Sequence, residues 1–194
     1  MILQLRIGTM ANICYILWDE KTKEGAVIDP GWESDKIIKQ IKDLGIKLKY
    51  ILLTHLHFDH YDSVPDIKKA TNAETVCNKK ENVSEIIDKH VKEGDSLYLG
   101  SKKIKVIDTP GHTAGGVCYL FDEKYLFAGD TLFCKGGYGR TDLPGGSESQ
   151  MKESLKKLMK LDENIIVYPG HNYSNCSEST IKNEKEFLKK YGVI

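Results

Sequence analysis

One stretch, in which an apolar run is followed at once by metal-binding side chains, constrains this chain more than any other. The run Tyr50-Ile51-Leu52-Leu53 has the length and character of a buried strand. It leads into Thr54-His55-Leu56-His57-Phe58-Asp59-His60, which holds three of the six histidines in the sequence. Ligands at the end of a buried strand lie at the edge of a sheet, where α/β proteins usually keep their chemistry. The stretch therefore predicts a metal site at one edge of a sheet.

The length and net charge of the chain favour a single domain without a nucleic-acid partner. The 194 residues fit one domain, which we expect to span residues 1–194. The 28 basic residues balance the 28 acidic ones without a dense basic run, which argues against a nucleic-acid partner. No apolar run reaches the ~20 residues that cross a bilayer, and residues 1–8 lack a signal-peptide pattern. We expect a cytoplasmic protein without a membrane partner, a monomer or small homo-oligomer.

The five cysteines are odd in number and widely spaced, which favours free thiols. None belongs to a C-x-x-C pair, so neither a disulfide framework nor a thiolate zinc site is indicated. We predict the reduced, buried or half-buried thiols of a cytosolic protein. Cys134 lies close to Asp130 in sequence, and we predict a packed thiol there. The five are Cys14, Cys77, Cys118, Cys134 and Cys176.

Alternating and periodic apolar patterns predict strands in both halves of the chain, with helical material after each group. This distribution predicts two sheets packed together with helices on their outer faces, an α+β four-layer sandwich. Strands are predicted at 3–7, 14–18, 26–28, 50–53, 75–77, 96–99, 103–108, 117–121, 125–128 and 165–168. Helices are predicted at 34–45, 64–71, 82–90, 147–159 and 177–191, and Ser34, Ser147 and Gly45 are candidate caps.

The side chains of the central stretch suit a pair of metal ions. In extended backbone His55 and His57 point to the same side, so both can hold one ion. Asp59 and His60 lie just beyond, where a turn would direct them to a second ion. Three later segments place a ligand type at the end of a predicted strand in the same way: Thr109-Pro110-Gly111-His112, Gly129-Asp130 and Pro169-Gly170-His171.

This set of motifs, from Asp29-Pro30-Gly31 to His171, resembles the metallo-β-lactamase superfamily. The resemblance implies an αββα sandwich of two mixed sheets with the metal site at one edge. It implies a hydroxide held between two divalent ions, with Asp59 and Asp130 as catalytic carboxylates and Asp29 orienting the histidine loop without binding metal. Zinc is the expected ion, with iron or manganese as alternatives at either position. The implied ligands are His55, His57 and His112 for one ion, Asp59, His60 and His171 for the other, and Asp130 between them.

The segment 139–146 after Gly129-Asp130 resembles the glyoxalase II branch, the hydroxyacylglutathione hydrolases, and residues 179–185 resemble its short bacterial members. This resemblance implies hydrolysis of a small acyl thioester. Tyr173 stands where that branch has a glutathione-contacting tyrosine, while Arg140 and Lys135 are candidate anion contacts. A tyrosine packed on the sheet and two solvated cations are the simpler interpretations. We expect no C-terminal helical domain of the glyoxalase II kind, which makes the thiol carrier an open question.

Two other functions stay open at this point. A persulfide dioxygenase would keep similar motifs but use one iron and consume oxygen. A non-catalytic metal-binding protein would be expected if ligands had been lost, and all seven positions carry a ligand type. The sixth histidine, His90, lies among charged residues and is predicted to be a surface residue.

Overall fold

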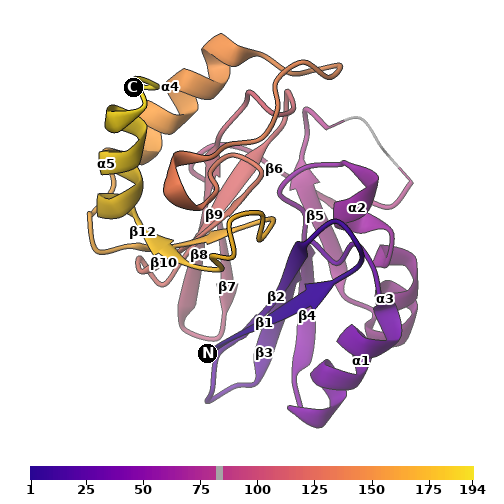
Figure 1. Ribbon diagram of the computed structural model, residues 1–194. Helices are drawn as coiled ribbons and strands as arrows, with labels where there is room; N and C mark the ends of the chain where they lie inside the picture. Colours follow the sequence, from indigo (N-terminus) through magenta and orange to yellow (C-terminus); the bar gives the residue numbers. More distant parts are fainter. Residues whose placement is uncertain (82–84) are drawn as a thin grey trace.

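The computed structural model describes residues 1–81 and 85–194, and within these ranges the strands form two six-stranded sheets (Figure 1). The first sheet has the order β1-β2-β3-β4-β5-β6, and the second has the order β12-β11-β10-β9-β8-β7. The first comprises β1 (Ile2–Ile7), β2 (Asn12–Trp18), β3 (Glu24–Ile28), β4 (Lys47–Leu52), β5 (Glu74–Asn78) and β6 (Lys89–Val91). The second comprises β7 (Ser96–Leu99), β8 (Lys102–Asp108), β9 (Val117–Phe121), β10 (Tyr125–Gly129), β11 (Ile166–Pro169) and β12 (Ser179–Thr180).

Both sheets are mixed, and their parallel pairs gather strand ends at a common edge. In the first sheet β3, β4, β5 and β6 run parallel, with helices in the crossovers after β3 and β4. In the second sheet β10 is parallel to β11, and β8 and β10 are both antiparallel to β9. In the second sheet, β8, β10 and β11 run in the same direction, so the segments that follow them leave from one edge. These segments and the one that follows β4 carry the predicted ligands.

Three apolar layers hold the sandwich together. Between the sheets, residues such as Tyr15, Tyr119 and Phe127 form one buried cluster to which both sheets contribute. The outer face of the first sheet packs on α1 (Ser34–Asp43) and α3 (Val64–Thr71). The outer face of the second packs on α4 (Glu148–Leu158) and α5 (Ile181–Lys190), so the predicted four-layer order is confirmed.

Several local predictions are confirmed and three are corrected. Ser34 does not cap α1, because it is the first residue of the helix and its hydroxyl donates to Asp66, while Glu33 occupies the N-cap position. Ser147 caps α4 by accepting from the Gln150 backbone N–H, and Gly45, with φ of 63°, follows the end of α1. The helix predicted at 82–90 is wrong over its described part, because residues 89–91 form β6 beside β5; residues 82–84 lie outside the described ranges. The last helix begins at residue 181 rather than 177, since residues 179–180 pair with β11 as β12 and Thr180 caps the helix.

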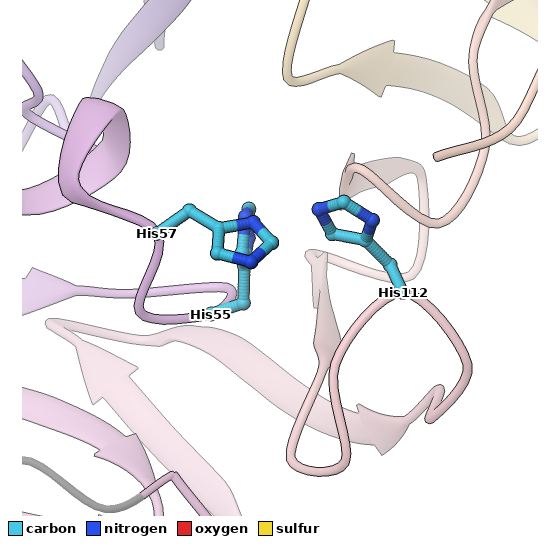
Figure 2. A group of neighbouring side chains, drawn as sticks. All are labelled: His55, His57 and His112. Atoms are coloured by element: carbon cyan, nitrogen blue, oxygen red, sulfur yellow. The ribbon is translucent and has the colours of Figure 1, made fainter. Parts of the chain in front are cut away.

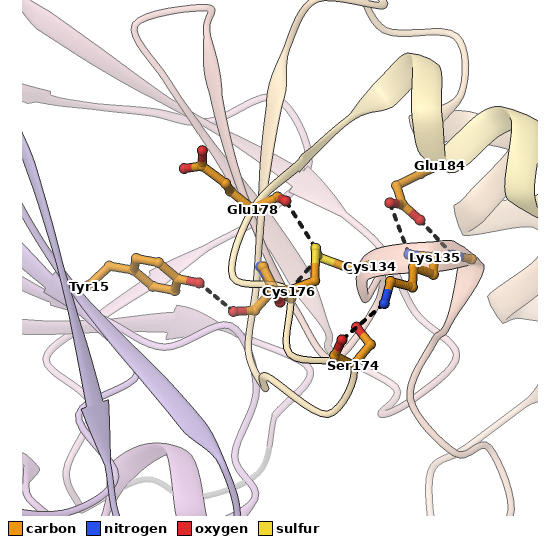
Figure 3. The surroundings of a disulfide bond; sticks show 9 residues. Tyr15, Cys134, Lys135, Ser174, Cys176, Glu178 and Glu184 are labelled. Atoms are coloured by element: carbon orange, nitrogen blue, oxygen red, sulfur yellow. Dashed lines mark hydrogen bonds between the residues drawn. A yellow bond between two sulfur atoms is a disulfide. The ribbon is translucent and has the colours of Figure 1, made fainter.

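The prediction of five free thiols is wrong for two of them. Cys134, in the short 3-10 turn η1 (Cys134–Gly136), forms a disulfide with Cys176, 42 residues later (Figure 3). The turn is held from the other side by buried Glu184, which accepts from the backbone N–H groups of Lys135 and Gly136. The spacing of the two cysteines did not predict this bond, because only the tertiary fold brings their segments together. The disulfide also removes the cysteine-based argument for a reducing compartment.

Candidate metal centre

The predicted ligands meet at one edge of the sandwich. His55 and His57 lie in the loop after β4, and Asp59 and His60 lie in the single-turn helix α2 (Phe58–Tyr61) that continues it. His112, Asp130 and His171 follow β8, β10 and β11 of the second sheet. Each sheet therefore contributes part of one cluster. All seven are buried except His57, which is half-buried.

The cluster divides into three groups, in each of which the ligand atoms lie within 4.8 Å of one another. The groups are His55 with His57 and His112, Asp59 with His60 and His171, and His55 with His60 and Asp130. Figure 2 shows the first group, in which the imidazoles of His55 and His57 face that of His112 from the other half of the chain. The first two groups match the two ligand sets implied by the resemblance.

Asp130 lies between these two groups. One of its carboxylate oxygens is 3.5 Å from His112 Nε2 and 3.4 Å from His171 Nε2. The other is 3.5 Å from His60 Nε2. The carboxylate can therefore contact ions held by either group.

Hydrogen bonds orient three imidazoles, and a close contact with a carboxylate orients a fourth. His112 Nδ1 lies 2.7 Å from the Arg140 carbonyl, and His171 Nδ1 lies 2.8 Å from the Met10 carbonyl. A carbonyl only accepts, so both Nδ1 atoms carry the proton and both Nε2 atoms keep a lone pair for a metal. His55 and His60 are held in a similar way through the Asp29 carboxylate.

Asp29 contacts the start of the histidine loop through its buried carboxylate. It accepts from the backbone N–H of Thr54 at 2.8 Å and from its hydroxyl at 2.7 Å, and it lies 3.1 Å from His60 Nδ1. Because the Thr54 hydroxyl donates to Asp29, it is left to accept from His55 Nδ1 at 3.1 Å. One buried carboxylate thus directs the Nε2 atoms of two histidines.

The donor atoms fit a divalent cation. His55 Nε2, His112 Nε2 and one oxygen of Asp130 are buried and have no hydrogen-bond partner among the described residues. His60 Nε2 and His171 Nε2 lie 3.2 Å apart, although Nδ1 of each ring already faces an oxygen, that of Asp29 or that of the Met10 carbonyl. Two lone pairs at this distance repel unless a cation or a proton lies between them. Metal ions bound by the two groups would satisfy all of these atoms.

In the metal-free cluster, the buried ligands differ in their charge at neutral pH. Burial and the neighbouring His60 lower the pKa of His55 well below its usual value, so its ring is neutral, the form that binds metal. Burial also lowers the pKa of His60, but Asp130 and Asp29 outweigh this effect and raise the pKa to about 9. Burial raises the pKa of Asp130, yet the His60 and His171 imidazoles lower it further, and the carboxylate stays ionised.

Two residues that position the ligands, Asn12 and Glu81, could not be identified from the sequence. The Asn12 side chain donates to the backbone oxygen and to the carboxylate of Asp59, at 3.0 Å each. The Glu81 carboxylate accepts from the backbone N–H of Leu56 at 3.2 Å and from that of Gly115 at 3.0 Å, and it also accepts from the Thr113 hydroxyl. Glu81 thereby links the His55-x-His57 loop to the loop of His112. Neither residue belongs to a local motif, so no sequence signal marked them.

A pocket of about 580 Å³ opens over the metal cluster. Tyr173 lines it with 61% of its surface exposed, and its ring stacks on His171 at 4.6 Å between centroids. Arg140 also lines it, but its guanidinium forms a two-pronged ion pair with Asp142 at 2.8 and 2.6 Å. Lys135 donates to the Ser174 carbonyl at 3.1 Å and is not among the lining residues. Both predicted anion contacts, Arg140 and Lys135, therefore already bind partners within the chain.

The remaining chemistry-bearing residues lie away from the cluster. His90 is exposed in β6, as predicted for a surface residue. Among the described residues, no helix is long and apolar enough to span a membrane.

Curated proteins similar to this chain include enzymes of more than one activity. It is 33% identical to the probable polyketide biosynthesis zinc-dependent hydrolase PksB of Bacillus subtilis, over 93% of this chain and 81% of that protein. It is 33% identical to the hydroxyacylglutathione hydrolase GloC of Haemophilus influenzae, over 89% of each. It is 32% identical to the mitochondrial persulfide dioxygenase ETHE1 of Mus musculus, over 88% of this chain and 68% of that protein.

Solved structures and family models give a consistent assignment. The crystal structure of ETHE1 from Myxococcus xanthus superimposes with a TM-score of 0.89 at 31% identity, covering 96% of this chain and 82% of that one. The model of the metallo-β-lactamase superfamily matches residues 8–171, a range that contains all seven clustered ligands. The fold, the ligand cluster and the relatives thus agree, and the chain belongs to the metallo-β-lactamase superfamily.

Proposed function

We propose that this protein hydrolyses acyl thioesters at a centre of two divalent metal ions. The observation that carries the proposal is the position of Asp130, whose carboxylate oxygens lie 3.4–3.5 Å from imidazole nitrogens of both ligand groups. One ion would be held by His55, His57 and His112 and the other by Asp59, His60 and His171, with Asp130 between them. A single-ion site would leave one of these buried groups without a partner.

The donor set favours zinc. The first group offers three imidazoles, and the second adds a carboxylate, which also suits iron or manganese. The name of the Bacillus subtilis relative, a zinc-dependent hydrolase, supports the same ion. When bound, such ions lower the pKa of a coordinated water toward neutrality and polarise a carbonyl oxygen.

The residues of the chain would then position water and substrate. In the reaction, water adds to the acyl carbon, the carbon–sulfur bond breaks, and a carboxylic acid and a thiol leave. Asp130 is placed to orient the attacking water between the two groups. Asp59, held by Asn12 and 3.5 Å from His171 Nε2, is the second carboxylate at the reacting centre and can accept a proton. The similarity to a hydroxyacylglutathione hydrolase supports a thioester as the substrate.

The test combines metal content with activity. Protein loaded with zinc should bind two ions per chain and hydrolyse a thioester such as S-lactoylglutathione or an acyl-coenzyme A. His57→Ala should lose one ion and at least about 100-fold in kcat/KM, since it removes a ligand. His90→Ala, which changes an exposed histidine in β6, is the matched control and should keep both. A His57→Ala variant with full activity would refute the two-ion mechanism.

A second candidate rests on the similarity to a persulfide dioxygenase, which extends over 88% of this chain. Such an activity would need one iron per chain and would consume oxygen with glutathione persulfide. Purification without added metal, followed by metal counting and oxygen-uptake assays, separates the two candidates. A chain that binds metal but supports neither reaction would instead be a non-catalytic metal-binding protein.

A further inference from the structure

Exposed apolar side chains are concentrated at the mouth of the pocket above the metal cluster. Among the described residues, six large hydrophobic side chains are exposed, and three of these line this one pocket. They are Met10 at 42%, Phe58 at 58% and Tyr173 at 61% exposure, and they come from three separate segments. Exposed apolar surface concentrated in one concavity is typical of a binding site for an apolar ligand.

The aromatic walls are held in place by their neighbours. Tyr173 stacks on His171 with ring planes 8° apart, and its ring meets the edge of Phe133 at 5.5 Å. Phe58, from the other half of the chain, packs edge-on against Trp32 at 6.0 Å. Tyr138 and Leu143 complete the apolar lining. These contacts fix a preformed apolar surface beside the metal cluster.

Away from the metal cluster, the lining of the same pocket offers little to an anion. Among its lining residues, Arg140 is the one side chain with a permanent positive charge, and Asp142 already neutralises it. Lys135 is bound to the Ser174 carbonyl outside the lining. A glutathione carrier brings two carboxylates, which would need cations that are not already paired.

We propose that this pocket binds the apolar acyl chain of the thioester and that the thiol carrier is not recognised through its charge. The inference rests on the proposed function, because it names the substrate class of the same site. The substrate class would be thioesters of unbranched or aromatic acyl groups with several carbons, in preference to hydroxyacyl-glutathione. Phe58 and Tyr173 are the specificity-determining residues, since they line the mouth from opposite halves of the chain.

The experiment uses the zinc-loaded protein and two series of thioesters. Acetyl, butanoyl, hexanoyl and octanoyl groups are placed on a neutral carrier, N-acetylcysteamine, and on glutathione. Burial of each added methylene is expected to raise kcat/KM by about two- to fourfold, as the transfer of a methylene from water implies. For a given acyl group, the two carriers should differ by less than about threefold.

The variants test which residues set the acyl preference. Phe58→Ala and Tyr173→Ala should flatten the rise of kcat/KM with chain length, mainly for the hexanoyl and octanoyl groups. Tyr98→Ala is the matched control, because Tyr98 is 49% exposed on β7 and does not line the pocket. The control should keep the slope of the parent protein.

The outcomes separate this inference from the proposed function. If the loaded protein hydrolyses no thioester in either series, the proposed function fails. If it hydrolyses them but shows no rise with chain length, or prefers glutathione esters by more than about threefold, the apolar-acyl inference alone is overturned. A slope that falls equally in Tyr98→Ala would also overturn it.

Discussion

Breaking the disulfide between Cys134 and Cys176 should lower the free energy of unfolding by about 2–4 kcal/mol. The bond closes a loop of 42 residues that includes α4 and β11. In the chain-entropy model such a loop restricts the unfolded state by about 4 kcal/mol at 25 °C. Native-state relaxation lowers the observed value, so about 4 kcal/mol is the upper end.

The perturbation is best made at Cys176, by Cys176→Ser. Cys134 is only 5% exposed, and a serine there would add the cost of burying a hydroxyl, whereas Cys176 is half-buried. Urea unfolding of the zinc-loaded parent, the parent with a phosphine reductant, and the variant should give three curves. With a slope of about 2–3 kcal/mol/M, the reduced parent and the variant should unfold about 1–2 M earlier than the oxidised parent.

The reductant also supplies the control, because it should leave the midpoint of Cys176→Ser unchanged. A phosphine is preferred to a dithiol, since dithiols bind zinc and would remove the metal. If the oxidised parent and the variant differ by less than about 0.5 kcal/mol, the entropic argument is refuted. If the parent shows no response to reductant while the variant is destabilised, the loss comes from the serine and not from the bond.

Three further perturbations follow from the site. Glu81→Gln should weaken the affinity for one of two zinc ions about 10-fold, because its carboxylate joins the two loops of the first group; competition with a chelator measures this. Gly170→Ala should lower metal occupancy, since an added Cβ would lie 2.5 Å from an Asp130 carboxylate oxygen; metal counting after zinc loading measures this. In the metal-free protein, the His60 pKa is raised from 6.5 to about 9, so its charged form stabilises the fold fully below pH 6.5. That stability should be lost as the pH rises through 9, and zinc uptake between pH 6.5 and 9 should release a proton, which calorimetry in two buffers detects.

The ligand cluster could be predicted because each ligand follows a strand whose apolar pattern is strong. His55 follows β4 and His171 follows β11, and both strands run into the common edge. The order of strands and turns in the sequence was therefore enough to predict that the ligands meet at one edge. Asp29 could be placed for the same reason, since it directly follows β3.

The supporting contacts could not be predicted, because they join segments that only the tertiary fold brings together. Glu81 bonds to loops 25 and 34 residues away, and Asn12 reaches Asp59 over 47 residues. The pairing of Cys134 with Cys176 has the same origin. The strand β6 was mistaken for a helix because its three residues are too few to show an alternating pattern.

The division of the ligands between the sheets has a consequence for the integrity of the chain. The first sheet and its loops provide His55, His57, Asp59 and His60, and the second provides the other three ligands. The exposed turn at Gly94 connects β6, the last strand of one sheet, to β7, the first of the other. Two fragments cut at this turn would each keep a whole sheet and only part of a binding site. The apolar cluster between the sheets would draw the fragments together, and zinc bound by ligands from both would strengthen their association.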